Sequence, residues 1–448
     1  MQKLVILGGG ESGYGAALLG KTRGYDTFLS DAQALKPLYK EKIQQLEIEF
    51  EENQHSLDRI LGADLIVKSP GIPEKAPIIQ AALARGIKII SEIEFASKFC
   101  TSRKICITGS NGKTTTTTLI HQILADAGVS VACAGNIGES FAATVALTPQ
   151  DEQPDWYVIE LSSFQLDGVF DFEADIALLL NITPDHLDRY DYQMSKYVAS
   201  KLRIVRNQTF DDTFIYNADD PVLRGALPSV ATEASRVPFS ALGTIGGAWY
   251  DGEMLRYCDF LFPASGLQIR GLHNIANALS AIVAAHRAGV SFDSIASTLR
   301  SFGGVEHRME RVGVVGGVEY INDSKATNVD SVSYALGSME RPTVWIAGGT
   351  DKGNDYSVLF DLARSRVKAL ICLGVDNSKL LSSFEGIIPT IVDTHSLAEA
   401  LSCARSLAES GDTVLLSPAC ASFDLFDSYE HRGELFKASV SGLEGFRR

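Results

Sequence analysis

The sequence predicts an α/β protein with parallel sheets, divided into three domains. Its 448 residues exceed what a single hydrophobic core holds, and a chain of this length suggests roughly three domains. Short apolar segments alternate with helix-like segments along the chain, which is the pattern of parallel sheets. Two of the apolar segments lead directly into glycine-rich turns, at residues 8–13 and 109–112. Parallel sheets bind ligands at the carboxyl ends of their strands, so both turns are candidate sites.

The composition excludes several classes of protein. Hydrophobic residues make up 45% of the chain, which is typical of a globular protein, and the net charge of −15 argues against nucleic acid or an anionic membrane as partner. No apolar run approaches the ~20 residues of a bilayer crossing, and the chain opens directly on a strand, so we expect an uncleaved cytoplasmic protein. The seven cysteines form no Cys-x-x-Cys pair and predict buried free thiols.

The first domain is expected to span residues 1–94. Its predicted strands are the apolar runs at residues 4–7, 27–29, 65–67 and 86–90. Gly8, Gly10 and Gly13 follow the first run with the spacing of a dinucleotide-binding turn, and Asp31 follows the second, where a ribose-binding acid would lie. Alone, this pattern indicates an NAD-binding domain. However, fewer than 100 residues precede the second nucleotide loop, so we favour a nucleotide-diphosphate substrate bound at the helix N-terminus.

The second domain is expected at residues 95–303 and begins with a phosphate-binding loop. A short apolar strand at residues 104–107 precedes Gly109-x-x-Gly112-Lys113-Thr114, and apolar residues at helical spacing follow it. The loop is two residues tighter than the general Gly-x₄-Gly-Lys-Ser/Thr pattern. Backbone N–H groups at the helix start would face the anion, Lys113 would neutralise it, and the hydroxyl of Thr114 would hold Mg²⁺. A simple tight turn is the alternative, which the strand and helix around the loop disfavour.

Glu160 is a candidate metal ligand of the same domain. It ends the predicted strand at residues 156–160, and its carboxylate could complete a Mg²⁺ site with Thr114, since hard cations take oxygen ligands. The alternative is an acid exposed at a strand end. Another strand is predicted at residues 176–180, and a β-rich patch from about 237 to 269 and a helix after residues 271–274 complete the domain.

Polar residues crowd the end of the strand at 176–180. His186, beside Asp185, is a better ligand candidate than the other histidines, because strand ends are common places for catalysis in such sheets. Lys201 lies four residues after Tyr197 on one face of a predicted helix. By itself Lys201 is only a helix cation.

The third domain, residues 304–448, is expected to alternate strand and helix again. Its clearest strands are at residues 343–347, 369–373 and 413–416. Residues 322–328, Asn-Asp-Ser-Lys-Ala-Thr-Asn, close another strand, and Lys325 could meet a γ-phosphate, although a polar turn is the alternative. Residues 348–353 and 417–423 end two further strands of this domain. Three strand ends with small and polar residues predict one rim of a cleft.

Together, and in this order, these motifs resemble the Mur ligase family over essentially the whole chain. The family phosphate loop Thr-Gly-x-Asn-Gly-Lys-Ser/Thr is present at residues 108–114. Residues 160–166, 322–328 and 416–422 are similar to the D-glutamate-adding branch of the family. The resemblance implies a Rossmann-like N-terminal domain for a UDP-sugar, a central P-loop ATPase domain with a small β-rich part, and a Rossmann-like C-terminal domain that binds the amino acid.

The resemblance also implies an activity, with ATP as co-substrate and two Mg²⁺ ions. It is an ATP-dependent amide ligase that adds D-glutamate to UDP-N-acetylmuramoyl-L-alanine through an acyl phosphate, in peptidoglycan precursor synthesis. These two substrates would be the only partners, with no nucleic acid and no membrane, and a monomer is expected. Rival members of the superfamily add L-alanine or diamino acids, or are folylpolyglutamate synthases, and the motifs at 322–328 and 416–422 disfavour them.

The site residues follow from the same resemblance. The catalytic residues would be Lys113, His186, Lys201 and Lys325. ATP would be bound by Gly109, Ser110, Asn111, Gly112, Lys113, Thr114, Thr115, Asn274, Asn277, Arg308 and Asp323, with His307 nearby. The UDP-sugar would be bound by Gly10, Glu11, Ser12, Asp31, Asn136, Ser162 and His186. D-Glutamate would be bound by Thr327, Lys352, Ser422 and Tyr429. The metal ligands would be Thr114, Glu160, His186 and Lys201, the last as a carbamate formed with CO₂.

Two hypotheses from other classes remain open on the residues alone. An NAD-dependent oxidoreductase would explain the turn at residues 8–13 and Asp31, but it leaves the loop at 108–114 without a role. A nucleotide-sensing module without catalysis would keep both loops. It would not need Glu160, His186 and Lys201 together.

Overall fold

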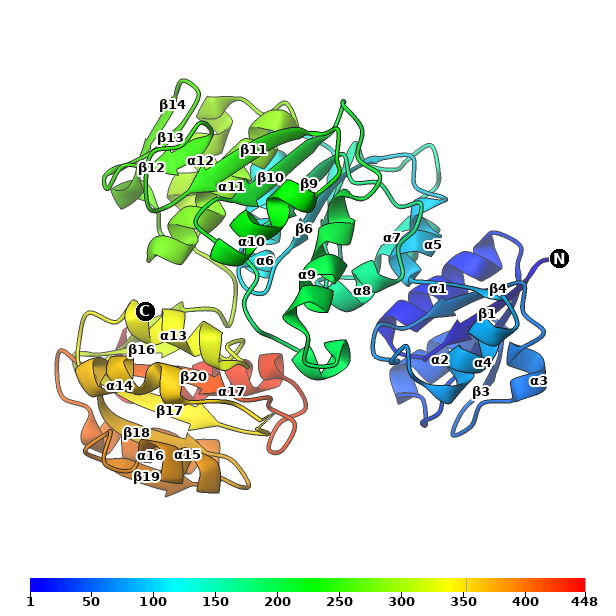
Figure 1. The fold of residues 1–448 in the computed structure, drawn as a ribbon. Coiled ribbons are helices and arrows are strands. Elements are labelled where there is room, and N and C mark those ends of the chain that lie inside the picture. Colours follow the sequence, from blue (N-terminus) through cyan, green and yellow to red (C-terminus); the bar gives the residue numbers. More distant parts are fainter. Residues whose placement is uncertain (352, 448) are drawn as a thin grey trace. The chain divides into compact units, whose positions relative to one another are not determined.

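The computed structural model describes residues 1–351 and 353–447, which form two compact units. The first unit comprises residues 1–268 and 272–302, and the second comprises residues 269–271 and those from 303 onward. Two sheets lie in the first unit and one in the second. Figure 1 draws the first sheet in blue, the second mainly in cyan and green, and the third in yellow to red. The predicted α/β class is confirmed.

The first sheet has five parallel strands in the order β3-β2-β1-β4-β5. The strands are β1 (Lys3–Leu7), β2 (Asp26–Ser30), β3 (Glu49–Glu51), β4 (Leu65–Lys68) and β5 (Lys88–Ile90). The helices are α1 (Glu11–Thr22), α2 (Pro37–Gln45), α3 (Leu57–Ile60), α4 (Pro77–Ala84) and α5 (Glu92–Ser97). The chain runs from β1 to β2 on one side and returns to β4 on the other. The loops after β1 and β4 therefore flank the switch point, where such sheets bind ligands.

Close packing fixes the glycines of α1. A Cβ at Gly13 would overlap the carbonyl oxygen of Gly8, so the helix can start tightly behind β1 only with glycine there. A Cβ at Gly15 would overlap the hydroxyl of Ser140. These two contacts explain why α1 packs against both its own turn and the start of α7 (Phe141–Leu147), a helix that follows the second sheet's strand β7 (Val131–Gly135).

The second sheet has nine strands in the order β14-β13-β12-β11-β10-β9-β6-β8-β7. The strands are β6 (Arg103–Thr108), β7 (Val131–Gly135), β8 (Trp156–Glu160), β9 (Ile176–Leu179), β10 (Thr213–Asn217), β11 (Ser235–Ser240), β12 (Ala248–Tyr250), β13 (Met254–Tyr257) and β14 (Phe260–Pro263). Two pairings at one edge of this sheet, β12 with β13 and β13 with β14, are antiparallel, and the others are parallel. This antiparallel end is the β-rich patch expected from the sequence.

Helices and short 3₁₀ turns connect these strands. They are α6 (Lys113–Asp126), α7 (Phe141–Leu147), α8 (Ser163–Asp167), η1 (Leu187–Tyr190), α9 (Met194–Leu202), η2 (Arg203–Val205), α10 (Pro221–Ala226), η3 (Leu227–Ser229), η4 (Ala264–Gly266), α11 (Leu272–Arg287) and α12 (Phe292–Ser301). The strand register places the candidate residues at one edge. Ile107 of β6 pairs with Glu160 of β8 on one side, and Thr108 pairs with Leu179 of β9 on the other.

The third sheet has the order β19-β18-β17-β20-β16-β15-β21, with antiparallel pairing only from β16 to β21. The strands are β15 (Glu310–Val315), β16 (Val318–Asn322), β17 (Thr343–Gly348), β18 (Val367–Leu373), β19 (Ile391–Thr394), β20 (Thr413–Ala419) and β21 (Phe446–Arg447). The helices are α13 (Val329–Gly337), η5 (Ser357–Leu359), α14 (Phe360–Arg366), α15 (Ser378–Phe384), α16 (Leu397–Leu407) and α17 (Tyr429–Ser441). Because β17, β20 and β16 are neighbours, the three predicted strand-end motifs share one edge.

Two expectations from composition can now be compared with the structure. Within residues 1–351 and 353–447, no helix is both long and apolar enough to cross a bilayer. All seven cysteines are free, as expected, but burial holds for only three of them, Cys106, Cys372 and Cys420. Cys258 is exposed because it lies in the tight turn between β13 and β14, at a positive φ of 49°.

Candidate active site

The phosphate-binding loop connects β6 to α6. Gly109 and Gly112 adopt φ values of 156° and 84°, which side chains rarely tolerate, and a Cβ at Gly112 would overlap the side-chain oxygen of Asn277. The loop therefore requires glycine at both positions. It leads into a 14-residue helix, whose first N–H groups and dipole favour an anion at this end.

Asn181, two residues after β9, holds the shape of this loop. Its side-chain oxygen accepts from the N–H of Asn111 at 2.8 Å, and its side-chain nitrogen donates to the Asn111 carbonyl at 3.0 Å. The Ser110 hydroxyl donates to the carbonyl of Thr183 at 2.9 Å and accepts from the N–H of the same residue. The sequence pointed to the polar segment 181–190 but assigned Asn181 no role, because the contact depends on β9 lying beside β6.

Two lysines converge on one carbonyl of the loop. Lys113 donates to the carbonyls of Gly109 and Ser110, both at 2.9 Å, and Lys201 of α9 donates to Gly109 at 2.8 Å. Lys201 is 2% exposed. Burial lowers its pKa well below the usual value, Lys113 lowers it further, and Asp185, Asp167 and Glu160 oppose the shift. The structure thus brings Lys201, a simple helix cation in the sequence, into the phosphate loop.

Glu160 presents an unused oxygen beside this loop. It ends β8 and is 1% exposed, and its Oε1 accepts from the side chain of Asn136 at 2.9 Å. Its Oε2 is buried and has no hydrogen-bond partner in the described part of the chain. A buried carboxylate oxygen without a donor is unfavourable unless a cation or another donor occupies its surroundings. Together with Thr114, which is buried in the first turn of α6, Glu160 is suited to hold a hard cation.

His186 lies on the loop after β9, in a left-handed conformation with φ of 52°. Its Nε2 is 3.6 Å from a carboxylate oxygen of Asp185, and the edge of its ring meets Phe164 at 5.1 Å between centroids. Asp185, the residue next to His186, is one of the carboxylates whose charge opposes the lowering of the Lys201 pKa. The side chain of His186 is 46% exposed, so it is accessible to a bound ligand.

Asn277 of α11 lies against the phosphate loop, and its neighbour Asn274 is bonded to it. Asn277 donates to the side-chain oxygen of Asn274 at 3.1 Å, and both residues are buried. The side-chain oxygen of Asn277 lies directly against Gly112. Thr115 is buried in the first turn of α6. The structure therefore gathers these predicted ATP-binding residues around one loop.

The turn after β1 is the second candidate site. A carboxylate oxygen of Asp31 accepts from the N–H of Gly9 at 2.7 Å, which ties the end of β2 to the turn. Across the switch point, the hydroxyls of Ser12 and Ser69 are 3.4 Å apart, and Ser69 also donates to the carbonyl of Gly8 at 3.3 Å. The residues predicted to bind a nucleotide diphosphate thus lie between the loops after β1 and β4.

Acidic residues surround the start of α1. Burial, followed by the nearby charge of Glu139, raises the pKa of Glu11, while the N–H of Ser140 bonds to its carboxylate and lowers it.

Ser162, another predicted sugar contact, caps α8 by accepting from the N–H of Gln165 at 3.3 Å. Both side chains therefore have structural partners within the protein itself.

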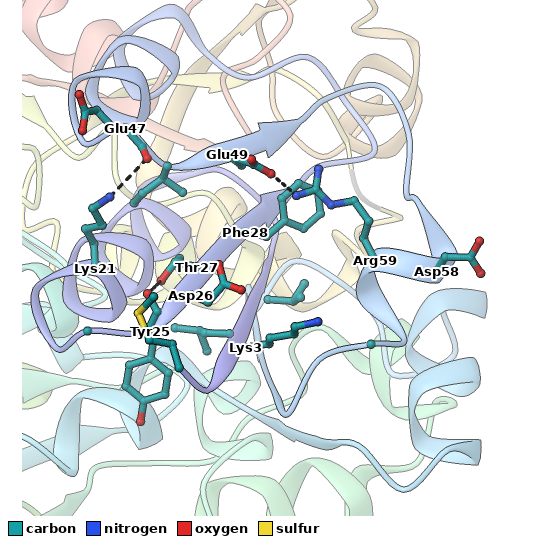
Figure 2. Close-up of a pocket in the computed structure, with 16 residues that line it drawn as sticks. Lys3, Lys21, Tyr25, Asp26, Thr27, Phe28, Glu47, Glu49, Asp58 and Arg59 are labelled. Atoms are coloured by element: carbon teal, nitrogen blue, oxygen red, sulfur yellow. Dashed lines mark hydrogen bonds and ion pairs between the residues drawn. The ribbon is translucent and has the colours of Figure 1, made fainter.

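A separate hollow of about 700 Å³ opens at the opposite edge of the first sheet. Its lining includes Lys3, Asp26 and Glu49, the first residues of β1, β2 and β3. Figure 2 shows Arg59 lying across the ring of Phe28, with its guanidinium 3.7 Å from the ring centroid and paired with Glu49. The hollow carries none of the predicted site residues, because those follow the carboxyl ends of the strands.

Asp323 and Lys325 follow β16 in the second unit. Asp323 is 2% exposed and accepts from the Ser417 hydroxyl at 2.8 Å. Burial raises its pKa to about 6, although the charge of Arg308 opposes the shift. Lys325 donates to the Tyr429 hydroxyl at 3.1 Å, and its N–H donates to the carbonyl of His307 at 3.0 Å. These predicted residues form one cluster.

The remaining predicted residues of this unit lie on adjoining loops. The N–H of Thr327 donates to the carbonyl of Lys325 at 2.9 Å, and Ser422 is buried directly after the bridge between Thr350 and Ala421. Lys352 lies outside the described residues.

Arg432 of α17 was missed by sequence reasoning. It is 1% exposed and donates to the Ser324 hydroxyl at 2.9 Å, to the Ser324 carbonyl at 2.8 Å and to the Cys420 carbonyl at 3.4 Å. It also donates to the carbonyl of Gly348 at 3.5 Å, and it thereby joins all three strand-end loops. No signal in the sequence separates it from a surface arginine, because its burial depends on where α17 packs.

Known protein families match all three parts of the chain. The models are the Mur ligase MurD-like N-terminal domain at residues 2–91, the Mur ligase middle domain at 107–285, and the Mur ligase glutamate ligase domain at 307–420. The UDP-N-acetylmuramoylalanine–D-glutamate ligase of Christiangramia forsetii is 50% identical over 447 residues, which cover 99% of this chain and 100% of the relative.

The chain belongs to the Mur ligase family. A second Mur ligase, the UDP-N-acetylmuramoylalanine–D-glutamate ligase of Bacteroides fragilis, is 49% identical and covers 99% of the chain and 100% of the relative. Among solved structures, the UDP-N-acetylmuramate-alanine ligase of Thermotoga maritima has a TM-score of 0.61 at 18% identity, covering 98% of this chain and 99% of that chain, which shows a shared fold. The resemblance found in the sequence is confirmed, while the domain boundaries near 95 and 303 stay predictions.

Proposed function

We propose that this Mur ligase adds D-glutamate to UDP-N-acetylmuramoyl-L-alanine and converts ATP to ADP and phosphate. The observation that carries the proposal is the match, over essentially its full length, to relatives that bear this activity as their name. The product is a precursor of peptidoglycan, and the reaction takes place in the cytoplasm, with the enzyme as a monomer. Residues 1–94 bind the UDP-sugar, 95–303 bind ATP, and 304–448 bind D-glutamate.

ATP occupies the loop after β6. The backbone N–H groups of residues 109–115 surround the phosphates, and Lys113 exchanges the carbonyls of Gly109 and Ser110 for phosphate oxygens. Asn274 and Asn277 lie against the same loop and contact the nucleotide. Asp323 and Arg308 of the second unit bind the ribose and phosphates, and Lys325 binds the γ-phosphate.

Two Mg²⁺ ions are part of this proposal. Thr114 and Glu160 would hold the first, and the buried Glu160 oxygen that has no other partner among the described residues supports this role. His186 and Lys201 would hold the second once the amine of Lys201 has added to CO₂ and lost a proton, because the resulting carbamate offers oxygen donors. The ions would offset the repulsion between the anions that must meet in the first step.

The reaction proceeds in two steps. A carboxylate oxygen of the L-alanyl group attacks the γ-phosphorus, the bond to the bridging oxygen breaks, and ADP leaves. The free amine of D-glutamate then attacks the acyl carbon, and the tetrahedral intermediate collapses to the amide with release of phosphate and a proton. Lys113 and Lys325 stabilise the charge that develops on the phosphoryl oxygens.

The substrates contact further residues in the three domains. Gly10, Ser12, Asp31 and Asn136 bind the UDP-sugar, with Glu11, Ser162 and His186 beside them. Thr327, Lys352, Ser422 and Tyr429 bind D-glutamate. Lys352 would pair with a carboxylate of this dianion, which a chain with a net charge of −15 would otherwise repel.

ADP release tests the proposal directly. The purified chain is incubated with ATP, Mg²⁺ and UDP-N-acetylmuramoyl-L-alanine, together with D-glutamate, L-glutamate, L-lysine or diaminopimelate. We expect ADP release only with D-glutamate, and none when the nucleotide-sugar is omitted. Release with another amino acid would reassign the substrate, and no release with any of the four would refute the ligase function.

A further inference from the structure

Arg189 connects the first two sheets. It lies in the loop after β9, three residues beyond His186, and its guanidinium donates to the carbonyl of Gly71 at 3.0 Å and to that of Pro70 at 3.1 Å. These carbonyls belong to the turn after β4. The same turn contains Ser69, whose hydroxyl contacts Ser12 and the carbonyl of Gly8 across the switch point. One side chain of the second sheet therefore holds one wall of the candidate nucleotide-sugar site.

The same guanidinium also supports the loop that carries His186. It lies over the ring of Phe164 at 4.5 Å, and the edge of the His186 ring packs on that phenylalanine at 5.1 Å. Cation–π and edge contacts of this kind stabilise a fixed stacking order. Moving the turn after β4 would therefore move Arg189, and with it the stack on which His186 rests.

The backbone of this loop is strained, which makes such support necessary. His186, Asp191 and Tyr192 all have positive φ values, of 52°, 52° and 57°, although none is a glycine. Residues held in this region are destabilised and persist where surrounding contacts determine their conformation, often at functional sites. The fork of Arg189 lies between the strained residues and is one of these contacts.

We propose that Arg189 is a positioning residue that couples occupancy of the nucleotide-sugar site to the placement of His186. A nucleotide diphosphate between the loops after β1 and β4 orders the turn at residues 69–72, and Arg189 transmits that order to the loop at 185–192. The proposal rests on the proposed function, which gives the two loops their ligands. It adds a physical link through which the sugar nucleotide prepares the ATP and metal site.

The test replaces the two-pronged guanidinium of Arg189 by side chains that cannot bond both carbonyls. It then measures how strongly the bound nucleotide-sugar changes the affinity for an ATP analogue. Lysine at position 189 keeps the positive charge but cannot donate to two carbonyls in one plane, and glutamine keeps a planar donor without the charge. Arg189→Lys and Arg189→Gln are therefore compared with Arg203→Lys. Arg203 is a matched control, because it also donates to a carbonyl, that of Val169 at 2.8 Å, and lies over a phenylalanine, Phe170, but in the described part of the chain it has no hydrogen bond to the turn after β4.

Two binding constants are measured by calorimetry on the full chain. The first is the affinity for UDP-N-acetylmuramoyl-L-alanine alone, which we expect to fall about tenfold in both Arg189 variants, since a bidentate charged contact is lost. The second is the affinity for a non-hydrolysable ATP analogue with Mg²⁺, with and without the nucleotide-sugar. In the wild type we expect the nucleotide-sugar to increase the affinity for the ATP analogue at least about fivefold. In the Arg189 variants we expect that affinity to be nearly the same with and without the nucleotide-sugar.

The outcomes separate this proposal from the proposed function. Wild-type coupling in the Arg189 variants, an equal loss in Arg203→Lys, or loss of the fold in both Arg189 variants would overturn it, because the residue would then act on stability alone. The expected loss of coupling, with a melting temperature close to that of the wild type, would support it. Absence of D-glutamate-dependent ADP release in a wild type that shows coupling would refute the ligase function but not the link through Arg189.

Discussion

The two glycine turns of the first unit have the same architecture and opposite chemistry. Each follows a central strand of a parallel sheet, β1 or β6, and each opens a helix, α1 or α6. The first turn of α1 begins with Glu11, whereas that of α6 begins with Lys113, and Lys201 donates to the loop before α6. The glycines provide the geometry for a phosphate group in both places. Under the proposed function the charges would decide which phosphate fits, because the lysines of the second turn would offset the charge of a triphosphate.

Removing the cation of the second turn should have the largest effect. We expect Lys113→Ala to lower ADP formation at least about 1000-fold, since transition-state charge would go unneutralised, while leaving affinity for the nucleotide-sugar unchanged. Steady-state ADP release and calorimetry measure the two effects. Lys21→Ala, at the far end of α1, is the matched control and should behave as the wild type. Turnover near the wild-type rate in Lys113→Ala would remove the phosphate loop from the mechanism.

The second lysine should follow closely. Lys201→Ala is expected to lose about 100-fold or more in turnover, because a metal ligand and a contact to Gly109 are both lost. Short carboxylates or chloride should partly restore the rate by replacing the anionic carbamate. Lys196→Ala on the same helix removes only an exposed ion pair with Asp191 and serves as the control. Full activity without any added anion would contradict the assignment of Lys201.

The acidic character of the first turn can be tested through Glu92, which accepts from the N–H of Ala142. Burial, followed by the charge of Glu11, raises the pKa of Glu92 to about 8 from the value of 4.5 expected in the unfolded chain, although the bond from Ala142 opposes the shift. The folded protein therefore keeps a proton that the unfolded chain releases. Between pH 4.5 and pH 8 the stability of the fold falls as pH rises, and above pH 8 this contribution is constant.

Glu92→Gln imitates the protonated form and should abolish this loss. We expect the variant to gain stability relative to the wild type as pH rises from 5 to 8.5, by about 4 kcal/mol. Urea unfolding at the two pH values provides the measurement. A difference between variant and wild type that does not change with pH would mean that Glu92 is ionised in the folded protein.

The smallest effect should come from the glycines of the first turn. A Cβ at Gly13 overlaps the carbonyl of Gly8, whereas a Cβ at Gly10 meets no atom within 4 Å. Gly13→Ala should therefore lower the free energy of unfolding by about 2 kcal/mol, and Gly10→Ala should leave it unchanged. Chemical denaturation of both variants checks the pair. Equal stabilities would show that the turn adjusts to a side chain, so that its geometry is not specific.

The sequence predicted the parts of the site that depend on local structure. Glycines at 109 and 112 predicted a backbone with positive φ, and the predicted strand before them and helix after them identified the segment as a phosphate-binding loop. Strand β8 was predicted with its observed limits because its apolar residues end abruptly at Glu160. Strand β3 was missed, since a three-residue segment with two glutamates has no apolar alternation.

Contacts between distant elements could not be predicted from the residues. The spacing of Tyr197 and Lys201 identified one helix face, but only the packing of α9 against the phosphate loop buries Lys201. Asn181, Arg189 and Arg432 depend in the same way on which strands and helices become neighbours. Asparagine and arginine are as common on protein surfaces as in binding sites. The roles of these three residues therefore become visible only when the fold brings their side chains to backbone carbonyls.

The two hydrogen bonds of the Asn181 side-chain amide restrict which residue types this position accepts. Its nitrogen donates to the Asn111 carbonyl and its oxygen accepts from the Asn111 N–H, so the side chain pairs with both backbone groups of one residue. Aspartate has the same shape but would present two acceptors to a carbonyl. Replacing one nitrogen atom by oxygen would thus push the phosphate loop away from β9 without altering any volume. The position admits an amide and excludes its closest isostere.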